Sequence, residues 1–171
     1  AEAALLAACR AGAPCELGEA RPAAPTDATR IRAPLLAYLI RGGCDGCPTT
    51  ERGVTVFGAS FTGALDLTGA TAQGRVGLFR CTFDTAITAQ DANLAALGLE
   101  GSTLPGLDMQ RAQVTGPVFL RDGFHATGRV TLSGARIGGQ LACAGGRFEN
   151  AGGWALHLQR ARVTESFLFR G

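Results

Sequence analysis

The chain has 171 residues, of which 46% are hydrophobic, 18% are charged and only 6% are aromatic. Its net charge of +2 argues against a dense acidic surface that mimics DNA and against a strongly basic surface that binds nucleic acid. No apolar run reaches the roughly 18 residues that a membrane-spanning helix needs, so we expect no membrane segment in this chain.

The first 52 residues lack the repeat that fills the rest of the chain, and we predict that they form a small α-helical cap. One helix is expected at 1–11 and a second at 29–41, joined by a Pro- and Gly-rich connection at 12–28. Pro34 does not fit a helix interior, so the regular part of the second helix should begin near it. Such a cap covers the unpaired edges and the apolar end of the first coil of a solenoid.

From residue 54 onward the sequence repeats every 11 residues as apolar-x-apolar-x-x-small-x-apolar-x-Gly-x. Two inward residues separated by one outward residue form a very short strand. Each unit holds two such strands, so four strands make one square coil of about 22 residues. The first apolar position of successive units is occupied by Val54, Leu65, Val76, Ile87, Leu97, Leu107, Val118, Val130, Leu141, Leu156 and Phe167.

This period predicts an all-β solenoid, a right-handed quadrilateral parallel β-helix of about five coils over residues 53–171, preceded by the cap at 1–52. A β-sandwich is the alternative, because turns every 8–12 residues are also typical of sandwiches. The apolar pairs span only three residues and keep their phase through ten successive steps, which favours the solenoid. Turn glycines such as Gly74 and Gly128 should let the chain corner without a Cβ clash.

Two segments are longer than the period, and two steps, Ile87 to Leu97 and Leu97 to Leu107, are one residue short. The segment Arg121–Thr127 is one residue too long and should bulge, and Glu149–Ala155 lies in a unit that is four residues too long and should form a loop. The loop carries Trp154, the only tryptophan, and insertions in solenoids often form binding surfaces. We predict an interaction loop made by Trp154, Asn150 and Glu149. The alternative is a tolerated surface loop whose tryptophan folds back on the coil.

The sequence stops at Phe167–Gly171, in the middle of a repeat unit. An uncovered coil exposes unpaired strand edges. We therefore expect that the native protein continues, or that a partner or a second copy covers this end.

The repeat resembles that of pentapeptide-repeat proteins, whose square right-handed β-helix has apolar residues at the central position and small residues two before it. Residues 118–153, 29–43 and 53–71 are similar to a bacterial group of uncharacterised pentapeptide-like proteins with an N-terminal helical region. The resemblance implies the fold and no activity. Some pentapeptide-repeat proteins resemble duplex DNA and engage gyrase. Residues 54–171 carry 10 Arg against 8 Asp and Glu, which disfavours such a mimic here.

Four cysteines are the sharpest chemical feature of the cap. Cys44 and Cys47 form a CxxC pair in a Gly-rich turn, and Cys9 and Cys15 precede them. Four thiolates could bind zinc tetrahedrally, and CxxC is a usual half-site, although the spacing of the other pair is wide for one. The alternatives are a disulfide within the cap, which requires an oxidising compartment, a redox-active pair, and reduced thiols.

No catalytic residue is predicted. His125 lies in the bulge beside Asp122 and His157 should point outward, but no Ser or Cys falls into a recognisable nucleophile elbow. No Gly-rich dinucleotide fingerprint is present, and the carboxylates are scattered over the faces. Cys81 and Cys143 occupy inward positions and should behave as small hydrophobic residues.

These features predict a non-enzymatic β-helical scaffold that binds a protein partner or a second copy through its walls, the Trp154 loop or the open C-terminal end. We expect no nucleic-acid partner and no cofactor, apart from zinc if the cap cysteines bind it. The alternative functions are a zinc- or redox-linked module and a gyrase-directed DNA mimic. We expect a cytoplasmic location because no signal peptide is present, although a longer native chain could be membrane-tethered.

Overall fold

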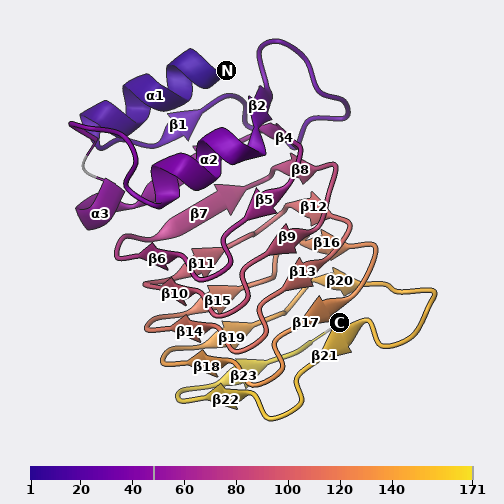
Figure 1. The fold of residues 1–171 in the computed structure, drawn as a ribbon. Helices are drawn as coiled ribbons and strands as arrows, with labels where there is room; N and C mark the ends of the chain where they lie inside the picture. Colours follow the sequence, from indigo (N-terminus) through magenta and orange to yellow (C-terminus); the bar gives the residue numbers. More distant parts are fainter. Residues whose placement is uncertain (48, 171) are drawn as a thin grey trace.

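The computed structural model describes residues 1–47 and 49–170, and it shows a chain wound into a four-sided coil of stacked strands (Figure 1). Four parallel sheets form the walls, which we name A to D in the order in which each coil visits them. The predicted all-β solenoid of about five turns is confirmed.

Most strands are only two residues long, as the repeat predicts. Wall A consists of β1 (Cys15–Glu16), β3 (Val54–Phe57), β7 (Val76–Phe79), β11 (Leu97–Gly98), β15 (Val118–Phe119), β19 (Leu141–Ala142) and β23 (Phe167–Leu168). Wall B consists of β2 (Arg30–Arg32), β4 (Ser60–Thr62), β8 (Thr82–Phe83), β12 (Thr103–Leu104), β16 (His125–Ala126) and β20 (Arg147–Phe148). Wall C consists of β5 (Leu65–Asp66), β9 (Ile87–Thr88), β13 (Leu107–Asp108), β17 (Val130–Thr131) and β21 (Leu156–His157). Wall D consists of β6 (Thr71–Ala72), β10 (Asn93–Leu94), β14 (Gln113–Val114), β18 (Arg136–Ile137) and β22 (Arg162–Val163).

Equivalent residues of successive coils pair in register and stack their side chains inside the coil, where they form one continuous apolar core. Inside wall B, for example, the rings of Phe61 and Phe83 stack with centroids 4.9 Å apart. The core also holds a polar side chain, Ser102. Its hydroxyl donates to the carbonyl of Leu78 at 2.7 Å and accepts from the amide of Cys81 at 2.8 Å. Because both bonds are made, this buried hydroxyl carries little desolvation cost.

The turn glycines are needed because successive coils approach closely. A Cβ atom on Gly74 would overlap the backbone of Gly53, and one on Gly128 would overlap the carbonyl oxygen of Pro105. The left-handed corners are separate positions, and they tolerate other residues. Arginine or aspartate occupies five of them in the part of the chain that the structure describes, namely Arg80, Asp91, Arg111, Asp122 and Arg160.

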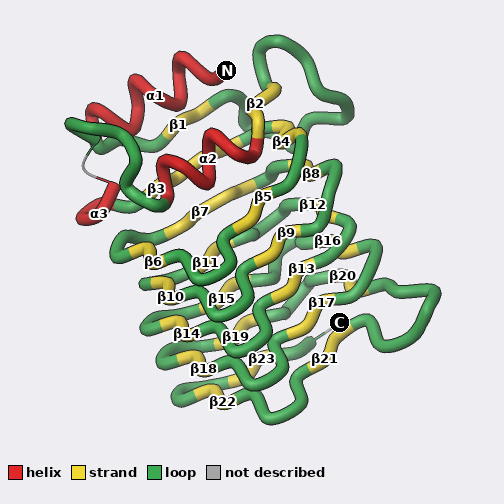
Figure 2. The backbone as a smooth tube through the Cα atoms, in the orientation of Figure 1, coloured by secondary structure: helices red, strands yellow, loops and turns green. Residues whose placement is uncertain are grey.

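The cap contains α1 (Glu2–Ala11), α2 (Ala33–Ile40) and the single turn α3 (Thr49–Arg52), which gather at one end of the coil (Figure 2). Pro34 lies in the first turn of α2, as expected. The rest of the cap prediction needs two corrections. Residues 30–32 form strand β2 instead of helix, and the connection at 12–28 contains β1. These strands pair with β4 and β3, so the cap supplies the first rung of walls B and A.

Side-chain contacts hold the cap together and fasten it to the solenoid. Glu2 of α1 accepts three hydrogen bonds from Arg32 at the start of α2, at 2.7 to 2.9 Å, and they lower the pKa of Glu2 to about 2. Arg21 donates to the carbonyls of Gly101, which follows β11, and Gly123, which follows β15 in the next coil. Loop 17–29 is thereby tied to the corner between walls A and B.

The coils differ in length where the sequence indicated. Wall A strands begin at residues 54, 76, 97, 118, 141 and 167, so the last step is the longest. Its extra residues lie in the loop between β20 and β21, which protrudes from the coil (Figure 1). In the bulge at 121–127, Asp122 and Gly123 are both left-handed. Both predicted departures from the period are therefore present.

Candidate functional site

The structure brings together only two of the four cap cysteines. Cys44 and Cys47 form a disulfide. Cys9 and Cys15 are buried in the core, and burial raises the pKa of both thiols. Among the side chains that the structure describes (1–47, 49 and 52–170), no group of three or more His, Cys, Asp or Glu could hold a metal ion. The predicted four-cysteine zinc site is therefore not assembled, and the arrangement matches the alternative of a disulfide within the cap.

The remaining cysteines are core residues. Cys81 and Cys143 are buried at inward positions of the solenoid, and burial raises the pKa of each thiol to about 12. Nucleophilic cysteines need a lowered thiol pKa and access to solvent. Both therefore act as small hydrophobic residues, as predicted.

The loop at 149–155 carries the most exposed large apolar side chain among the described residues. Trp154 is 78% exposed, so it does not fold back on the coil. Asn150 shapes the loop from within, because its side chain donates to the carbonyl of Trp154 at 3.0 Å and accepts from the amide of Gly152 at 3.3 Å. The loop therefore holds an aromatic side chain away from the wall.

Glu149 anchors the base of this loop. One carboxylate oxygen lies 2.7 Å from Nε2 of His125, and the other accepts two hydrogen bonds from Arg147, at 2.9 and 2.6 Å. These contacts lower the pKa of Glu149, with the His125 bond as the largest cause. Both carboxylate oxygens are already bonded within wall B. Of the three predicted loop residues, Glu149 and Asn150 thus position the loop and Trp154 presents a free surface.

Wall A carries an outward aromatic cluster, Phe57, Phe79 and Phe119, that sequence reasoning missed. The rings of Phe57 and Phe79 stack with centroids 4.9 Å apart. Gly77 and Gly98 are outward neighbours in register. A Cβ on Gly77 would overlap the ring of Phe79 and one on Gly98 would press against it, so this ring lies close to the wall. A signal was present in the sequence, because two glycines recur 21 residues apart in the same outward slot.

Arginines of the same wall stack on these rings. The guanidinium carbon of Arg80 lies 5.3 Å from the Phe57 centroid, that of Arg75 lies 5.6 Å from Phe79, and that of Arg121 lies 4.3 Å from Phe119. Such cation–π contacts contribute roughly 0.5–1 kcal/mol each at exposed sites. The arginines cover part of an apolar surface that would otherwise face water.

Glu100 lies beside this cluster and is mostly buried. Its side chain is 16% exposed, one carboxylate oxygen lies 3.6 Å from the Arg121 guanidinium, and the other is buried without a hydrogen-bond partner. Burial raises the pKa of Glu100. A recess of about 270 Å³ adjoins the carboxylate, and it is lined by Phe57, Phe79, Arg80, Glu100, Gly101 and Asp122. A carboxyl group with a raised pKa in a recess is a common feature of binding sites, although ion-pair networks produce it as well.

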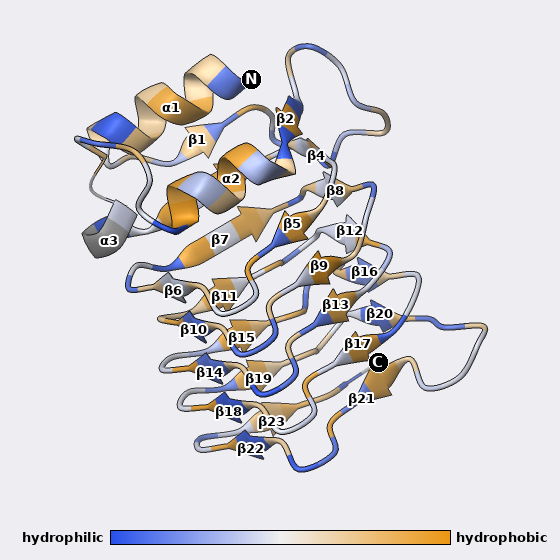
Figure 3. Cartoon of the chain, in the orientation of Figure 1, coloured by the Kyte–Doolittle hydropathy of each residue, from blue (hydrophilic) through white to orange (hydrophobic). Residues whose placement is uncertain are grey.

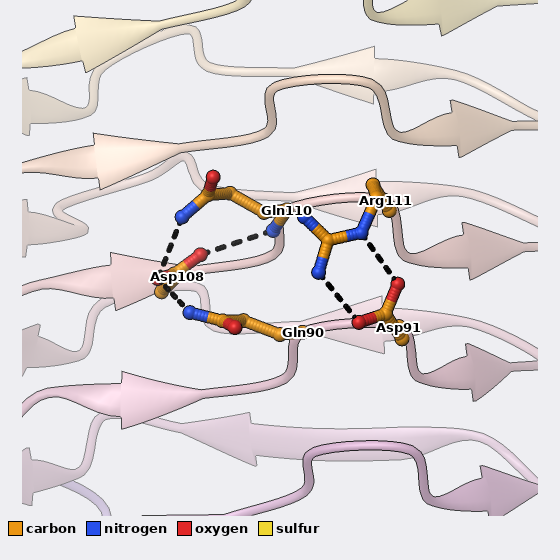
Figure 4. A network of polar contacts seen from close by, with 5 residues as sticks. All are labelled: Gln90, Asp91, Asp108, Gln110 and Arg111. Carbon is orange, nitrogen blue, oxygen red and sulfur yellow. Dashed lines mark hydrogen bonds and ion pairs between the residues drawn. The ribbon is translucent and has the colours of Figure 1, made fainter.

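Wall C instead joins its coils through polar contacts (Figure 4). Asp108 accepts from the side-chain amides of Gln90, at 2.6 Å, and Gln110, at 3.1 Å. Arg111 donates two hydrogen bonds to Asp91 in the preceding coil, at 2.7 and 2.6 Å. The two carboxylates of this network are bonded within the wall, so the network fastens adjacent coils to each other.

No family model, no curated protein and no solved structure matches the chain. Within the described residues, no helix is long and apolar enough to cross a membrane.

Proposed function

We propose that the protein is a non-enzymatic β-helical scaffold that binds a protein partner through the Trp154 loop. The exposed tryptophan carries this proposal. Tryptophan is enriched among residues that dominate binding energy, and this one is 78% exposed on a loop that the coil does not need. Asn150 and Glu149 hold the loop in place, and such pre-organisation lowers the entropic cost of binding.

The finer identity of the scaffold belongs to the same proposal. Four walls, and coils of 21 to 23 residues apart from a last coil of 26, support a pentapeptide-repeat-like protein of the bacterial type. The excess of Arg over acids along residues 54–171 supports a protein partner over gyrase-directed DNA mimicry.

The test is site-specific photocrosslinking in cells that express the chain natively. A benzophenone amino acid placed at position 154 should give a discrete adduct, and the same probe at Gln73, an exposed wall D residue, should not. Unlabelled wild-type chain should compete for the partner and lower the yield of the adduct. Unlabelled Trp154→Ala should compete at least tenfold less well. Identical adducts from both positions, or none from position 154, would refute the loop as a binding surface.

A redox-linked cap is the second candidate, because Cys44 and Cys47 form a disulfide. Closing so short a loop should stabilise the cap by roughly 2 kcal/mol in the chain-entropy account. Reductant should then lower the Tm of the wild type and leave that of the double variant Cys44→Ser, Cys47→Ser unchanged. The same Tm for all four samples would remove this candidate. A bridged pair in cells would also contradict the predicted cytoplasmic location, since disulfides persist in oxidising compartments.

A further inference from the structure

Wall D contains a recess whose polar side chains can all donate hydrogen bonds. The recess measures about 280 Å³ and is lined chiefly by Gln113, Thr115, Arg136, Gly138, Arg162 and Thr164. Arg136 pairs in register with Arg162 of the next coil. Gly138 lies between Thr115 and Thr164 in the stack of coils, and a Cβ there would overlap the carbonyl oxygen of Thr115, so this position must be glycine.

The two arginines are stacked like charges. Strands of a sheet lie about 4.8 Å apart, and like charges directly opposite each other destabilise a sheet. Among the described side chains, those of 1–47, 49 and 52–170, no acidic group lies within 4.0 Å of either guanidinium, and no carboxylate lines the recess. Both arginines are exposed. Arg111 offers a contrast in the same molecule, because Asp91 of the adjacent coil neutralises it at 2.6 Å.

We propose that this recess binds a tetrahedral oxyanion, the phosphate group of a small phosphate monoester. Guanidinium groups match phosphate oxygens through paired N–H donors. Two guanidinium groups on adjacent strands can hold one dianion between them, which removes their mutual repulsion. The hydroxyls of Thr115 and Thr164 and the amide of Gln113 add uncharged donors. The recess is larger than one phosphate, so it has room for the rest of a small polar molecule.

This site is independent of the Trp154 loop, and its ligand is a small anion instead of a protein. Both guanidinium groups face solvent, so the anion remains partly hydrated and salt should weaken its binding. We expect inorganic phosphate to bind weakly, and most tightly at low ionic strength.

The experiment is a calorimetric titration of the 171-residue chain with inorganic phosphate, glycerol 3-phosphate and glycerol. Phosphate and glycerol 3-phosphate should bind and glycerol should not. A tighter Kd for glycerol 3-phosphate identifies a phosphate monoester as the ligand class. Equal affinities would overturn that class and leave free phosphate as the ligand.

Matched variants separate the recess from general charge effects. Arg136→Gln and Arg162→Gln should each weaken phosphate binding about tenfold, and Thr164→Val should weaken it less. Arg129→Gln removes the same charge from an exposed arginine between walls B and C, and it should leave the Kd unchanged. Thermal melting of each variant checks that it is folded. An absence of phosphate binding, or an equal loss in Arg129→Gln, would overturn the proposal.

Discussion

Walls A and D belong to the same coils, yet their outward faces have opposite character. The outward column of wall A reads Thr55, Gly77, Gly98, Phe119, Ala142 and Leu168, whereas that of wall D reads Thr71, Asn93, Gln113, Arg136 and Arg162. Figure 3 shows the same contrast, with apolar β11, β15 and β19 and hydrophilic β10, β14 and β18. Both walls are apolar inside. The coil thus constrains inward residues everywhere and leaves each outward face free to acquire its own chemistry.

The largest loss of stability is expected from the inward residues, which are apolar in both walls. Leu99 points inward from wall A and Leu94 from wall D, and both are buried. Truncation of either to alanine should cost about 2–5 kcal/mol of unfolding free energy, because buried leucines leave cavities. Urea denaturation of Leu99→Ala and Leu94→Ala measures both. Unfolding in two separate steps, with each variant lowering only one of them, would show that the walls do not share one cooperative core.

The second effect should separate the walls. Phe79→Ala removes a ring that stacks on Phe57 and lies over two glycines, so we expect a loss of about 1–3 kcal/mol. The matched change Asn93→Ala on wall D removes an exposed side chain and should stay within about 0.5 kcal/mol. Equal losses of unfolding free energy in the two variants would mean that the stacking of Phe79 does not stabilise wall A.

Inward and outward residues also differ in how well the sequence predicted them. The 11-residue period located the core columns from Val54 to Phe167 because an inward residue must be apolar. Outward residues obey no such rule, so the period could not reveal that Phe79 lies over Gly77 and Gly98.

The cap shows the same limit. Pro34 predicted the start of α2, because proline lacks an amide N–H and fits only the first turn of a helix. Strands β1 and β2 were missed because they lie outside the repeat, and two or three residues alone carry too little pattern. Their hydrogen bonds depend on the edges of β3 and β4. The loop at 149–155 was predicted from its length, but the exposure of Trp154 depends on Asn150, whose bonds only the folded loop shows.

The third prediction concerns pH, where two acids should respond with opposite sign. Burial raises the pKa of Glu100, so the folded state holds its proton more tightly and loses stability as pH rises from the ordinary glutamate range through the raised pKa. Arg111 lowers the pKa of Asp91, so that contribution is present above the ordinary aspartate range and is lost as pH falls through the lowered pKa.

Melting curves between pH 3 and pH 8 test both acids. Glu100→Gln should raise the Tm at pH 8 relative to the wild type, by up to about 1 kcal/mol in unfolding free energy, and should matter least at pH 3. Asp91→Asn should lower the Tm at pH 8 and converge with the wild type at low pH. A Glu100→Gln effect that is the same at every pH would show that the carboxylate is not destabilised by burial.

The smallest effect compares paired with unpaired arginines. Arg111 is paired with Asp91, and both side chains are more than half exposed. Arg162 faces only another arginine across the strands. In low salt without phosphate, Arg111→Gln should therefore lower the Tm slightly, whereas Arg162→Gln should raise it because a repulsion is removed. Salt screens both interactions, so at 1 M sodium chloride the two variants should have the same Tm as the wild type. Tm shifts of the same sign in the two variants at low salt would mean that Arg136 and Arg162 do not repel each other measurably.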